Sequence, residues 1–460
     1  MDILSALQEI VGPQGLMTDP KACAPYLQES RGEQIGQALA VLQPVNASQV
    51  SRIVTLCAKA GIGIVPQGGN TGRVLGACPQ AGQVLLSMTR LARMRSLDED
   101  ARVVCAEAGM TLAQVNRAAQ AFGLMWPVDL LPKERAQVGG ILASNAGGLS
   151  VVRYGNARAS MLGVEAVLAN GEIYDGLRQV RKDNCGYDLA NLLVGSEGTL
   201  GIITAASLAL TPIPKRRALC LLGITDIAHG IEFYRRFCAR FSSELMICEL
   251  MPHPGIENAC ACDETCSLPL DSLHDWYLLI GLAWYENDDR IEKAARTLVA
   301  KEVHTWEGDE NIWRLREGIV TSQAKLGKSA RYDISVPLSC LADFIKAANQ
   351  AVQAIAPSAQ PIIFGHLGDG NIHYDVLEKN PSAYSAFQAC RGQLDEAIFS
   401  LVLARGGSIC AEHGVGRRKR ALLARGVSPT AYQAMVTIKK SLDPAGLLNP
   451  GVMFDHADLQ

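Results

Sequence analysis

Apolar and polar residues repeat at helical spacing over residues 46–61. The apolar positions of this stretch are Val50, Ile53, Val54 and Cys57. They fall on one face of a helix, because positions three or four residues apart lie side by side. Asn46 or Ser48 can cap the start of the helix, and Gly61 can end it. The pattern therefore predicts an amphipathic helix with one buried face.

Short apolar runs with the composition of strands follow this helix. They lie at 62–66, 84–88 and 102–108. A second helix is predicted over 111–123, where Thr111 and Gln114 have the spacing of a capping box and Gly123 ends the pattern. Helices and strands mixed in this way are typical of an α+β domain.

The pattern changes near residue 210, where "TPIPKRR" interrupts it. From 217 to about 410, strand-like stretches such as "WYLLIGLAWY" alternate with helical ones such as "LADFIKAANQAVQAIA". This alternation predicts a second domain with an antiparallel sheet covered by helices. We therefore predict an α+β chain with domains at 1–212 and 213–408 and a C-terminal segment at 409–460.

Composition and charge limit the class of protein. The chain is 48% hydrophobic and 19% charged, which is typical of a soluble globular protein. A net charge of −3 gives no electrostatic reason to expect nucleic acid as a partner. No apolar run approaches the ~18 residues of a membrane helix. The N-terminus has no basic region before an apolar core, so we expect a cytoplasmic protein without a signal peptide. A homodimer is compatible with these features.

Fourteen cysteines are scattered along the chain. Several, such as Cys57 and Cys105, lie in apolar runs, so free buried thiols are expected rather than disulfides. Cys260, Cys262 and Cys266 lie close together in "CACDETC" and can form part of a soft-metal site. No second cluster is present to complete a tetrahedral zinc site.

Three glycine-rich stretches occur in the first 210 residues, at 66–76, 138–156 and 183–204. Small residues let backbone N–H groups approach a phosphate closely, and glycine permits the backbone angles of an anion-binding loop. Three such stretches favour a large ligand that carries phosphate. A nicotinamide site needs GxGxxG and an acid about twenty residues later, and a Walker loop needs G-K-S/T. Neither pattern is present, which argues against NAD and ATP.

The stretch "IIFGHLGDGNIHYDV" at 362–376 predicts a hairpin with Asp369–Gly370 at its turn. This register places His366 opposite His373, with Cβ atoms about 5 Å apart. Phe364 and Asp375 form the next pair on the same face. Facing histidines can bind one metal ion, although an isolated pair is more often a hydrogen-bonded polar pair.

Glu412, in "ICAEHGVGRRK", can complete a His, His, Glu site with open positions, as in catalytic metal centres. His413 is the next residue. Neighbours point to opposite faces of a regular strand, but Gly414 and Gly416 permit an irregular turn that could aim both inward.

Six ordered motifs carry a family resemblance. They are "PQGGNTG", "SNAGGLSVVRYGN", "RKDNCGYDLANLLVGSEGTLGIIT", "GHLGDGNIH", "AEHGVGRRK" and "LDPAGLLNPG". Together they resemble the FAD-linked oxidoreductases of the vanillyl-alcohol oxidase type, in the branch with D-lactate, glycolate and D-2-hydroxyglutarate dehydrogenases. The similarity extends from about residue 40 to 454. It implies a two-part FAD-binding domain, an antiparallel-sheet cap domain over the isoalloxazine, and a C-terminal segment that returns to the flavin.

The resemblance also implies which residues contact FAD. They are Pro66, Gly68, Gly69, Asn70, Thr71, Gly72, Asn145, Ala146, Gly147, Gly148, Gly198, Thr199, Gly201, Ile202 and Asn449. No histidine precedes His229, and Asn70 stands where a flavin-linking histidine can occur in the family, so we expect non-covalent FAD. Lys133, Glu134 and Arg135 depart from the small segment of the relatives, so contacts of this loop with FAD cannot be carried over.

By the same resemblance, His366, His373 and Glu412 bind a divalent metal, with zinc expected before manganese or iron. His413 would be the base that takes the substrate hydroxyl proton. Arg316 and Arg331 would hold carboxylates.

Two positions depart from the family pattern. Where the family carries a hydroxyl-bearing residue, this chain has Val320, with Thr321 next to it. Where the family carries an asparagine, this chain has Asp375. Asp375 could be an extra metal ligand, or could disfavour a second carboxylate on the substrate.

The predicted function is FAD-dependent, metal-assisted oxidation of a D-2-hydroxy acid, with D-2-hydroxyglutarate favoured. A dehydrogenase of the D-lactate or glycolate type, acting on a monocarboxylic acid, is the alternative. The expected electron acceptor is an electron-transfer flavoprotein, a quinone or a cytochrome. A metal-dependent hydrolase is a remote alternative, because it leaves the three glycine-rich stretches unexplained.

Overall fold

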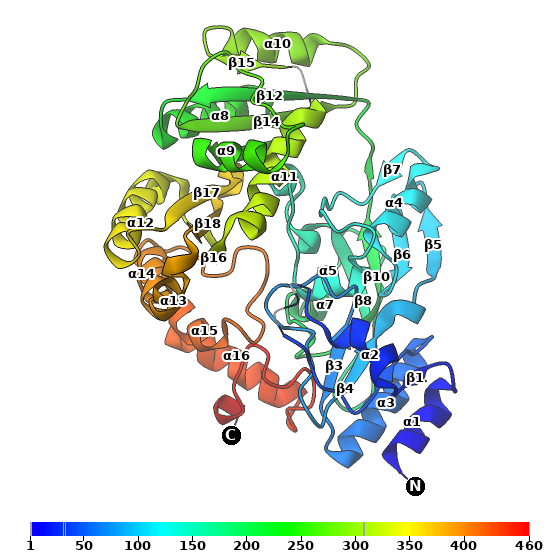
Figure 1. The fold of residues 1–460 in the computed structure, drawn as a ribbon. Helices are drawn as coiled ribbons and strands as arrows, with labels where there is room; N and C mark the ends of the chain where they lie inside the picture. The colour runs from blue at the N-terminus through cyan, green and yellow to red at the C-terminus, as the bar shows by residue number, and fades with distance from the viewer. Residues whose placement is uncertain (1, 31, 33, 307–308, 460) are drawn as a thin grey trace. The chain divides into compact units, whose positions relative to one another are not determined.

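The computed structural model describes residues 2–30, 32, 34–306 and 309–459, and the chain divides into two compact units. The first unit consists of Met1–Gly148, Tyr154–Ile213 and His413–Gln460. The second unit consists of Leu149–Arg153 and Pro214–Glu412. Figure 1 shows the chain, with the elements labelled as in the text.

The first part of unit 1 is built on a four-stranded sheet of order β1-β2-β4-β3, in which β2, β4 and β3 are parallel and β1 is antiparallel. The strands are β1 (Leu16–Met17), β2 (Val41–Leu42), β3 (Ile64–Gln67) and β4 (Val84–Ser87). The helices are α1 (Ile3–Val11), α2 (Pro20–Leu27), α3 (Ala47–Ala60) and the 3-10 helix η1 (Met88–Arg90).

Helix α3 forms where the apolar stripe predicts it. The Asn46 side chain accepts a hydrogen bond from the Gln49 N–H, and Gly61 ends the helix in the left-handed conformation, with φ of 64°. The stripe residues Val50, Ile53, Val54 and Cys57 are buried.

The second part of unit 1 is built on a five-stranded antiparallel sheet of order β5-β6-β10-β8-β9. The strands are β5 (Met94–Asp98), β6 (Val103–Glu107), β8 (Met161–Val167), β9 (Ile173–Gly176) and β10 (Ile202–Ala209), and β7 (Leu124–Met125) pairs with β11 (Thr211–Pro212). The helices here are α4 (Leu112–Gln120), α5 (Val138–Ala143), η2 (Ala157–Ser160) and α7 (Leu189–Leu193), and α6 (Val151–Tyr154) lies at the change of unit.

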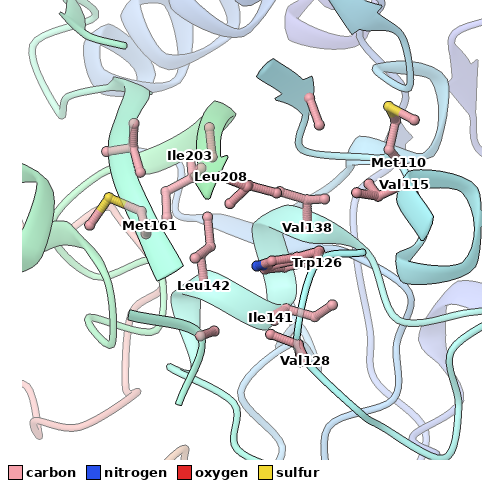
Figure 2. Close-up of a cluster of buried hydrophobic side chains, with 14 of the residues drawn as sticks. Met110, Val115, Trp126, Val128, Val138, Ile141, Leu142, Met161, Ile203 and Leu208 are labelled. Carbon is pink, nitrogen blue, oxygen red and sulfur yellow. The ribbon is translucent and has the colours of Figure 1, made fainter. Parts of the chain in front are cut away.

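Figure 2 shows the apolar core of this part, where Trp126 is packed beside Val138, Ile141 and Val128. Trp126 is fully buried, and its indole N–H donates to Ser160 Oγ at 2.8 Å. Helix α4 has the predicted capping box between Thr111 and Gln114. It ends three residues before Gly123, which takes a φ of 68° in the turn that follows. The predicted C-terminus is therefore too late by one turn.

The C-terminal segment of unit 1 contains α15 (Arg420–Gly426), α16 (Pro429–Leu442) and η6 (Ala457–Leu459). It returns to the first sheet, because the Ile64 N–H donates to Leu447 O and the Asn449 N–H donates to Ile64 O, both at 2.8 Å.

Unit 2 is built on a seven-stranded sheet of order β15-β12-β14-β13-β17-β18-β16, in which every pair is antiparallel. The strands are β12 (Arg216–Ile224), β13 (Leu245–Pro252), β14 (Trp276–Trp284), β15 (His304–Thr305), β16 (Lys328–Ser335), β17 (Gln360–His366) and β18 (Asn371–Glu378). The prediction of an antiparallel sheet in this part of the chain is confirmed.

Helices cover this sheet. They are α8 (Ile227–Phe241), α9 (His253–Cys262), α10 (Arg290–Val299), α11 (Asp309–Leu326), α12 (Leu341–Ile355), α13 (Tyr384–Ala389) and α14 (Arg391–Leu403), with 3-10 helices η3 (Leu338–Cys340), η4 (Leu367–Asp369) and η5 (Pro381–Ala383). Helices α9 and α11 pack against each other, as Figure 1 shows. They share one apolar core with the sheet. Ile319 of α11, Ile256 of α9 and Phe364 of β17 belong to this core.

Two further expectations concern the chain as a whole. The cysteines are free thiols, and Cys57 and Cys105 are buried. Cys260 and Cys262 lie in α9, and Cys266 is buried under α11. In the part of the chain that the structure describes, these three do not form a group of metal-ligating atoms. No helix within the described ranges has both the length and the apolar character to cross a bilayer.

Candidate active site

The β17–β18 hairpin carries both candidate histidines, but its register differs from the predicted one. His366 pairs with Asn371, and Phe364 pairs with His373, so the predicted register is wrong by two residues. The reason is the turn: Leu367–Asp369 forms a 3-10 helix and Gly370 follows with φ of 76°. A shift of two residues keeps every side chain on its predicted face. The two imidazole rings therefore remain neighbours, with centroids 6.1 Å apart.

Glu412 joins the two histidines in unit 2. The ligand atoms of His366, His373 and Glu412 all lie within 4.8 Å of one another. His366 Nε2 lies 3.0 Å from Glu412 Oε1, and His373 Nε2 lies 3.9 Å from Glu412 Oε2. Two imidazole nitrogens and a carboxylate fit a zinc, manganese or iron ion that keeps open positions. The residues present thus have the donor atoms and the spacing that a divalent metal needs.

Glu249, which the sequence analysis did not select, lies behind His366. It belongs to β13 and pairs with His366 across the sheet. Its Oε1 is 2.9 Å from His366 Nδ1, and its Oε2 accepts a hydrogen bond of 2.5 Å from Arg316 Nε. All three side chains are buried. The only sequence signal was an acid within the apolar strand "LMICELMP".

Asp333 supports the other histidine and the third ligand. It pairs with His373 across β16 and β18. Asp333 Oδ1 accepts a hydrogen bond from Asn371 Nδ2, and Oδ2 accepts one from the Glu412 N–H, both at 3.0 Å. The backbone of Glu412 is thereby tied to the sheet that carries the histidines.

The protonation of the histidines differs. Burial lowers the pKa of His373 to about 4, so its ring is neutral at pH 7, as a metal ligand must be. Burial opposes the charged form of His366 as well, but the carboxylates of Glu249 and Glu412 raise its pKa well above the ordinary value. Burial also opposes ionisation of Glu249, but Arg316 and His366 hold the pKa of this carboxyl far below its usual range. Without a metal, a protonated His366 therefore lies between two carboxylates.

The candidate carboxylate-binding residues occupy two places in unit 2. Arg316, on α11, is buried against Glu249, with its guanidinium 5.1 Å from the centroid of the Phe364 ring. Arg331, on β16, pairs with Asp375 of β18 across the sheet, and its Nε lies 3.9 Å from Asp375 Oδ2. Arg331 Nε also donates to Ser329 Oγ at 2.9 Å.

Helix α11 directs Gln323, and not Thr321, toward Asp375. Gln323 is fully buried, and its Nε2 donates to Asp375 Oδ2 at 2.9 Å. Thr321 lies on the exposed side of α11, and Val320 packs against the apolar core. Residues three or four positions apart share a helix face, so Arg316, Ile319 and Gln323 face the sheet together. The helical spacing from Arg316 could have identified Gln323.

In unit 1, the three glycine-rich stretches meet. A Cβ on Gly69 would lie 1.8 Å from Arg135 O, one on Gly148 would lie 2.1 Å from Asp129 O, and one on Gly198 would lie 2.6 Å from Pro66 Cγ. Side chains are therefore excluded at these glycines. Asn70 and Asn145 hold left-handed φ values of 50° and 47°, which asparagine tolerates better than most residues.

The other predicted FAD contacts lie on the same loops of unit 1. They are Gly68, Thr71, Gly72, Ala146, Gly147, Thr199, Gly201 and Ile202. The Gly72 carbonyl accepts a hydrogen bond from Ser30 Oγ at 2.5 Å, and Thr199 Oγ1 donates to Ser196 O at 2.7 Å. Ile202 begins β10.

The charged loop that departs from the family pattern contacts the first glycine-rich stretch. Arg135 Nη2 donates to Asn70 O at 3.3 Å and approaches Gly69 O at 3.5 Å. Glu134 forms an ion pair with Arg117 at 3.2 Å. A guanidinium thus lies against the loop expected to bind the pyrophosphate.

The C-terminal segment contacts these loops through several hydrogen bonds. Asn449 Nδ2 donates to Gly76 O at 2.8 Å and to Glu197 O at 2.7 Å. The Glu197 carboxylate accepts hydrogen bonds from the N–H groups of Val415 and Gly416, both at 2.8 Å. Burial raises the pKa of Glu197 to about 7.

Asn449 Oδ1 is buried and has no hydrogen-bond partner among the described residues. An orphaned buried acceptor needs a donor that the chain itself does not provide. Together with the crowded glycines of the loops, it fits a polar ligand such as FAD in unit 1. His413 is half-buried and follows Glu412 directly in the chain.

Known protein families and relatives match this chain over most of its length. The family profile "FAD linked oxidases, C-terminal domain" matches residues 213–453, and "FAD binding domain" matches residues 38–176. The chain is 33% identical to a mitochondrial D-2-hydroxyglutarate dehydrogenase of Bos taurus, over 98% of this chain and 82% of that protein. It is 31% identical to a D-2-hydroxyglutarate dehydrogenase of Xanthomonas citri, over 98% and 97% of the two chains.

Solved structures show the same fold. p-Cresol methylhydroxylase with bound substrate is similar with a TM-score of 0.79 at 17% identity, over 98% of this chain and 96% of that chain. The 4-ethylphenol oxidase of Gulosibacter chungangensis gives a TM-score of 0.74 at 18% identity, with the same coverage of 98% and 96%. The predicted α+β fold with an FAD-binding part and an antiparallel-sheet part is confirmed.

Proposed function

We propose that this chain, which belongs to the FAD-linked oxidase family, oxidises a D-2-hydroxy acid to the 2-oxo acid, with D-2-hydroxyglutarate as the favoured substrate. The grouping of Glu412 with His366 and His373 of the β17–β18 hairpin is the observation that carries the proposal. Relatives named D-2-hydroxyglutarate dehydrogenases, which match over nearly the whole chain, support the choice of substrate.

FAD would be held without a covalent bond by the three glycine-rich stretches and by Asn449. When bound, the flavin supplies a hydride acceptor. Backbone N–H groups of residues 68–72 would bind the pyrophosphate, and the Arg135 guanidinium would add positive charge beside it. The unpartnered Asn449 Oδ1 would accept a hydrogen bond from the cofactor.

His366, His373 and Glu412 would hold a divalent metal, with zinc expected first. Such an ion lowers the pKa of a hydroxyl that binds to it. His413 would accept the hydroxyl proton on its imidazole as a general base. Glu412 and His413 are consecutive, so any movement of one is transmitted to the other through the backbone.

The arginines would bind carboxylates. Arg316 Nε donates a hydrogen bond to Glu249, and the Nη groups of Arg316 would donate to the substrate carboxylate. Arg331 would meet the second carboxylate of a dicarboxylic acid. Asp375 supports the alternative of a monocarboxylic, D-lactate-type or glycolate-type substrate, because its charge lies 3.9 Å from the Arg331 Nε and would repel a second carboxylate.

The electron acceptor would be an electron-transfer flavoprotein, a quinone or a cytochrome. A relative from Saccharomyces cerevisiae, 28% identical over 94% of this chain and 89% of that protein, is named a D-2-hydroxyglutarate–pyruvate transhydrogenase. A 2-oxo acid should therefore be included among the acceptors that are tested.

Anaerobic flavin reduction tests the proposal. The purified protein should be yellow, and its visible flavin absorbance should be bleached by D-2-hydroxyglutarate and not by the L isomer. D- and L-lactate, glycolate and D-malate complete the series and distinguish one carboxylate from two. If no 2-hydroxy acid of either hand bleaches the flavin, the proposed function is wrong.

A further inference from the structure

We infer that Glu249 is a positioning residue that fixes the orientation of His366, so that His366 presents Nε2 to a metal, and that Arg316 stabilises the charge of Glu249. The inference rests on the metal-binding part of the proposed function. It concerns residues of unit 2 only, and every contact that it uses lies within that unit.

The two ring nitrogens of His366 face two different carboxylates. His366 Nδ1 lies 2.9 Å from Glu249 Oε1, and Nε2 lies 3.0 Å from Glu412 Oε1. An imidazole that binds a metal through one nitrogen carries its proton on the other. When Nε2 binds an ion, the remaining proton is on Nδ1 and faces Glu249, whose carboxylate can only accept. The contact between His366 Nδ1 and Glu249 Oε1 is an ion pair, since Oε1 accepts no hydrogen bond from the described residues.

Glu249, His366 and Arg316 are buried together. Glu249 and His366 are 0% and 6% exposed at their side chains, so an ionised Glu249 needs a compensating charge close by. Arg316 provides it through the 2.5 Å hydrogen bond to Oε2, with a side chain that is only 7% exposed. The Arg316 guanidinium also stacks over Phe364, whose ring lies 5.0 Å from that of His373. Arg316 and Glu249 therefore form a buried support behind the histidines.

Glu249 and His366 lie opposite each other on two neighbouring strands of the sheet. Strand β13 pairs with β17 through Glu249 and His366 themselves, so backbone pairing fixes the distance between the two side chains. A carboxylate on a paired strand is held more firmly than one on a loop. The sheet thus supplies a rigid partner for His366 before any metal binds.

Metal binding by the full-length FAD protein tests the inference. Chelator-treated wild type and Glu249→Gln are dialysed to equilibrium against Zn²⁺, and bound zinc is measured by elemental analysis. We expect Glu249→Gln to bind zinc about 10–100-fold more weakly, because the neutral amide no longer favours the required ring orientation. FAD content should stay equal in both proteins, since the flavin loops belong to unit 1.

Two further variants keep the test decisive. Glu257→Gln is the matched control, because Glu257 also pairs with a histidine, His253, at 3.4 Å, but on the surface. It should bind zinc as the wild type does. Glu249→Gln/Arg316→Gln removes the unpaired arginine, so it should regain thermal stability and still bind zinc weakly.

The zinc-binding results distinguish the positioning role of Glu249 from the metal-binding part of the proposed function. Wild-type affinity for zinc in a folded Glu249→Gln protein would overturn the positioning role of Glu249. Recovery of wild-type affinity in the double variant would also overturn it, because the defect would then come from the unpaired arginine. No specific zinc binding by the wild type itself would instead refute the metal-binding part of the proposed function.

Discussion

Replacement of Lys439 by methionine should strongly destabilise unit 1. The Lys439 ammonium donates to Thr199 O at 2.7 Å and to Leu448 O at 3.0 Å, and it pairs with Asp443 Oδ2 at 2.5 Å. The side chains of Lys439 and Asp443 are 3% and 0% exposed. Methionine fills a similar volume but leaves the Asp443 charge without its cation.

The magnitude follows from these contacts. Removal of one partner of a buried ion pair costs about 3–5 kcal/mol. The lower end applies here, because Asp443 still accepts hydrogen bonds from the N–H groups of Leu447 and Leu448. A loss of about 3 kcal/mol lowers Tm by roughly 6–12 °C in a unit of this size.

Thermal unfolding, followed by release of the flavin at a fixed excess of free FAD, measures this loss. Lys440→Met is the matched control, since Lys440 is the next residue of α16 and its side chain is only half-buried. Its Tm should change by no more than ~2 °C, as for an ordinary surface substitution. Lys439→Met/Asp443→Asn should recover part of the loss. If Lys439→Met unfolds at the same temperature as Lys440→Met, the reasoning about the buried pair is wrong.

Three other predictions follow from the same structure. His413→Ala should retain FAD but reduce the rate of flavin reduction by about 10²–10⁴-fold in anaerobic stopped-flow measurements, and a wild-type rate would exclude His413 as the base. Dialysis against a chelator should abolish turnover and leave the flavin spectrum intact, whereas full activity in metal-free protein would contradict the metal-binding role of His366. Burial raises the pKa of Glu197 to about 7, so its protonated form stabilises the folded state below the unfolded-state pKa, and this contribution is lost as the pH rises through 7. The Tm of the wild type should therefore fall more than that of Glu197→Gln between pH 5 and pH 8, and parallel Tm curves would refute this assignment.

Local features of the fold could be predicted because their causes are local. Helix α3 has its cap, its stripe and its terminal glycine within one stretch of sequence. The capping box of α4 likewise depends on two residues one turn apart. The hairpin turn shows the limit, because Asp-Gly favours a two-residue turn whereas Leu367–Asp369 adopts a 3-10 helix.

The residues behind the candidate metal ligands could not be predicted, for a physical reason. Glu249 reaches His366 only through the pairing of β13 with β17, and Asp333 reaches His373 through the pairing of β16 with β18. Strand order between distant segments depends on the packing of the whole sheet and has no local signature. A buried acid in an apolar strand was the available signal, since such a group needs a charged partner.

The contact between the last segment and β3 has a consequence for the order in which the protein is made. Residues 447–449 pair with Ile64, which leaves the ribosome much earlier. Strand β3 cannot form these backbone hydrogen bonds until residues 447–449 have been synthesised. Thr199 O likewise cannot accept its hydrogen bond from Lys439 until that residue has been synthesised. The flavin-binding unit is therefore completed only after the whole of unit 2 has been synthesised. Capture of FAD should accordingly follow translation of residue 449, and nascent chains arrested before that point should not retain the cofactor.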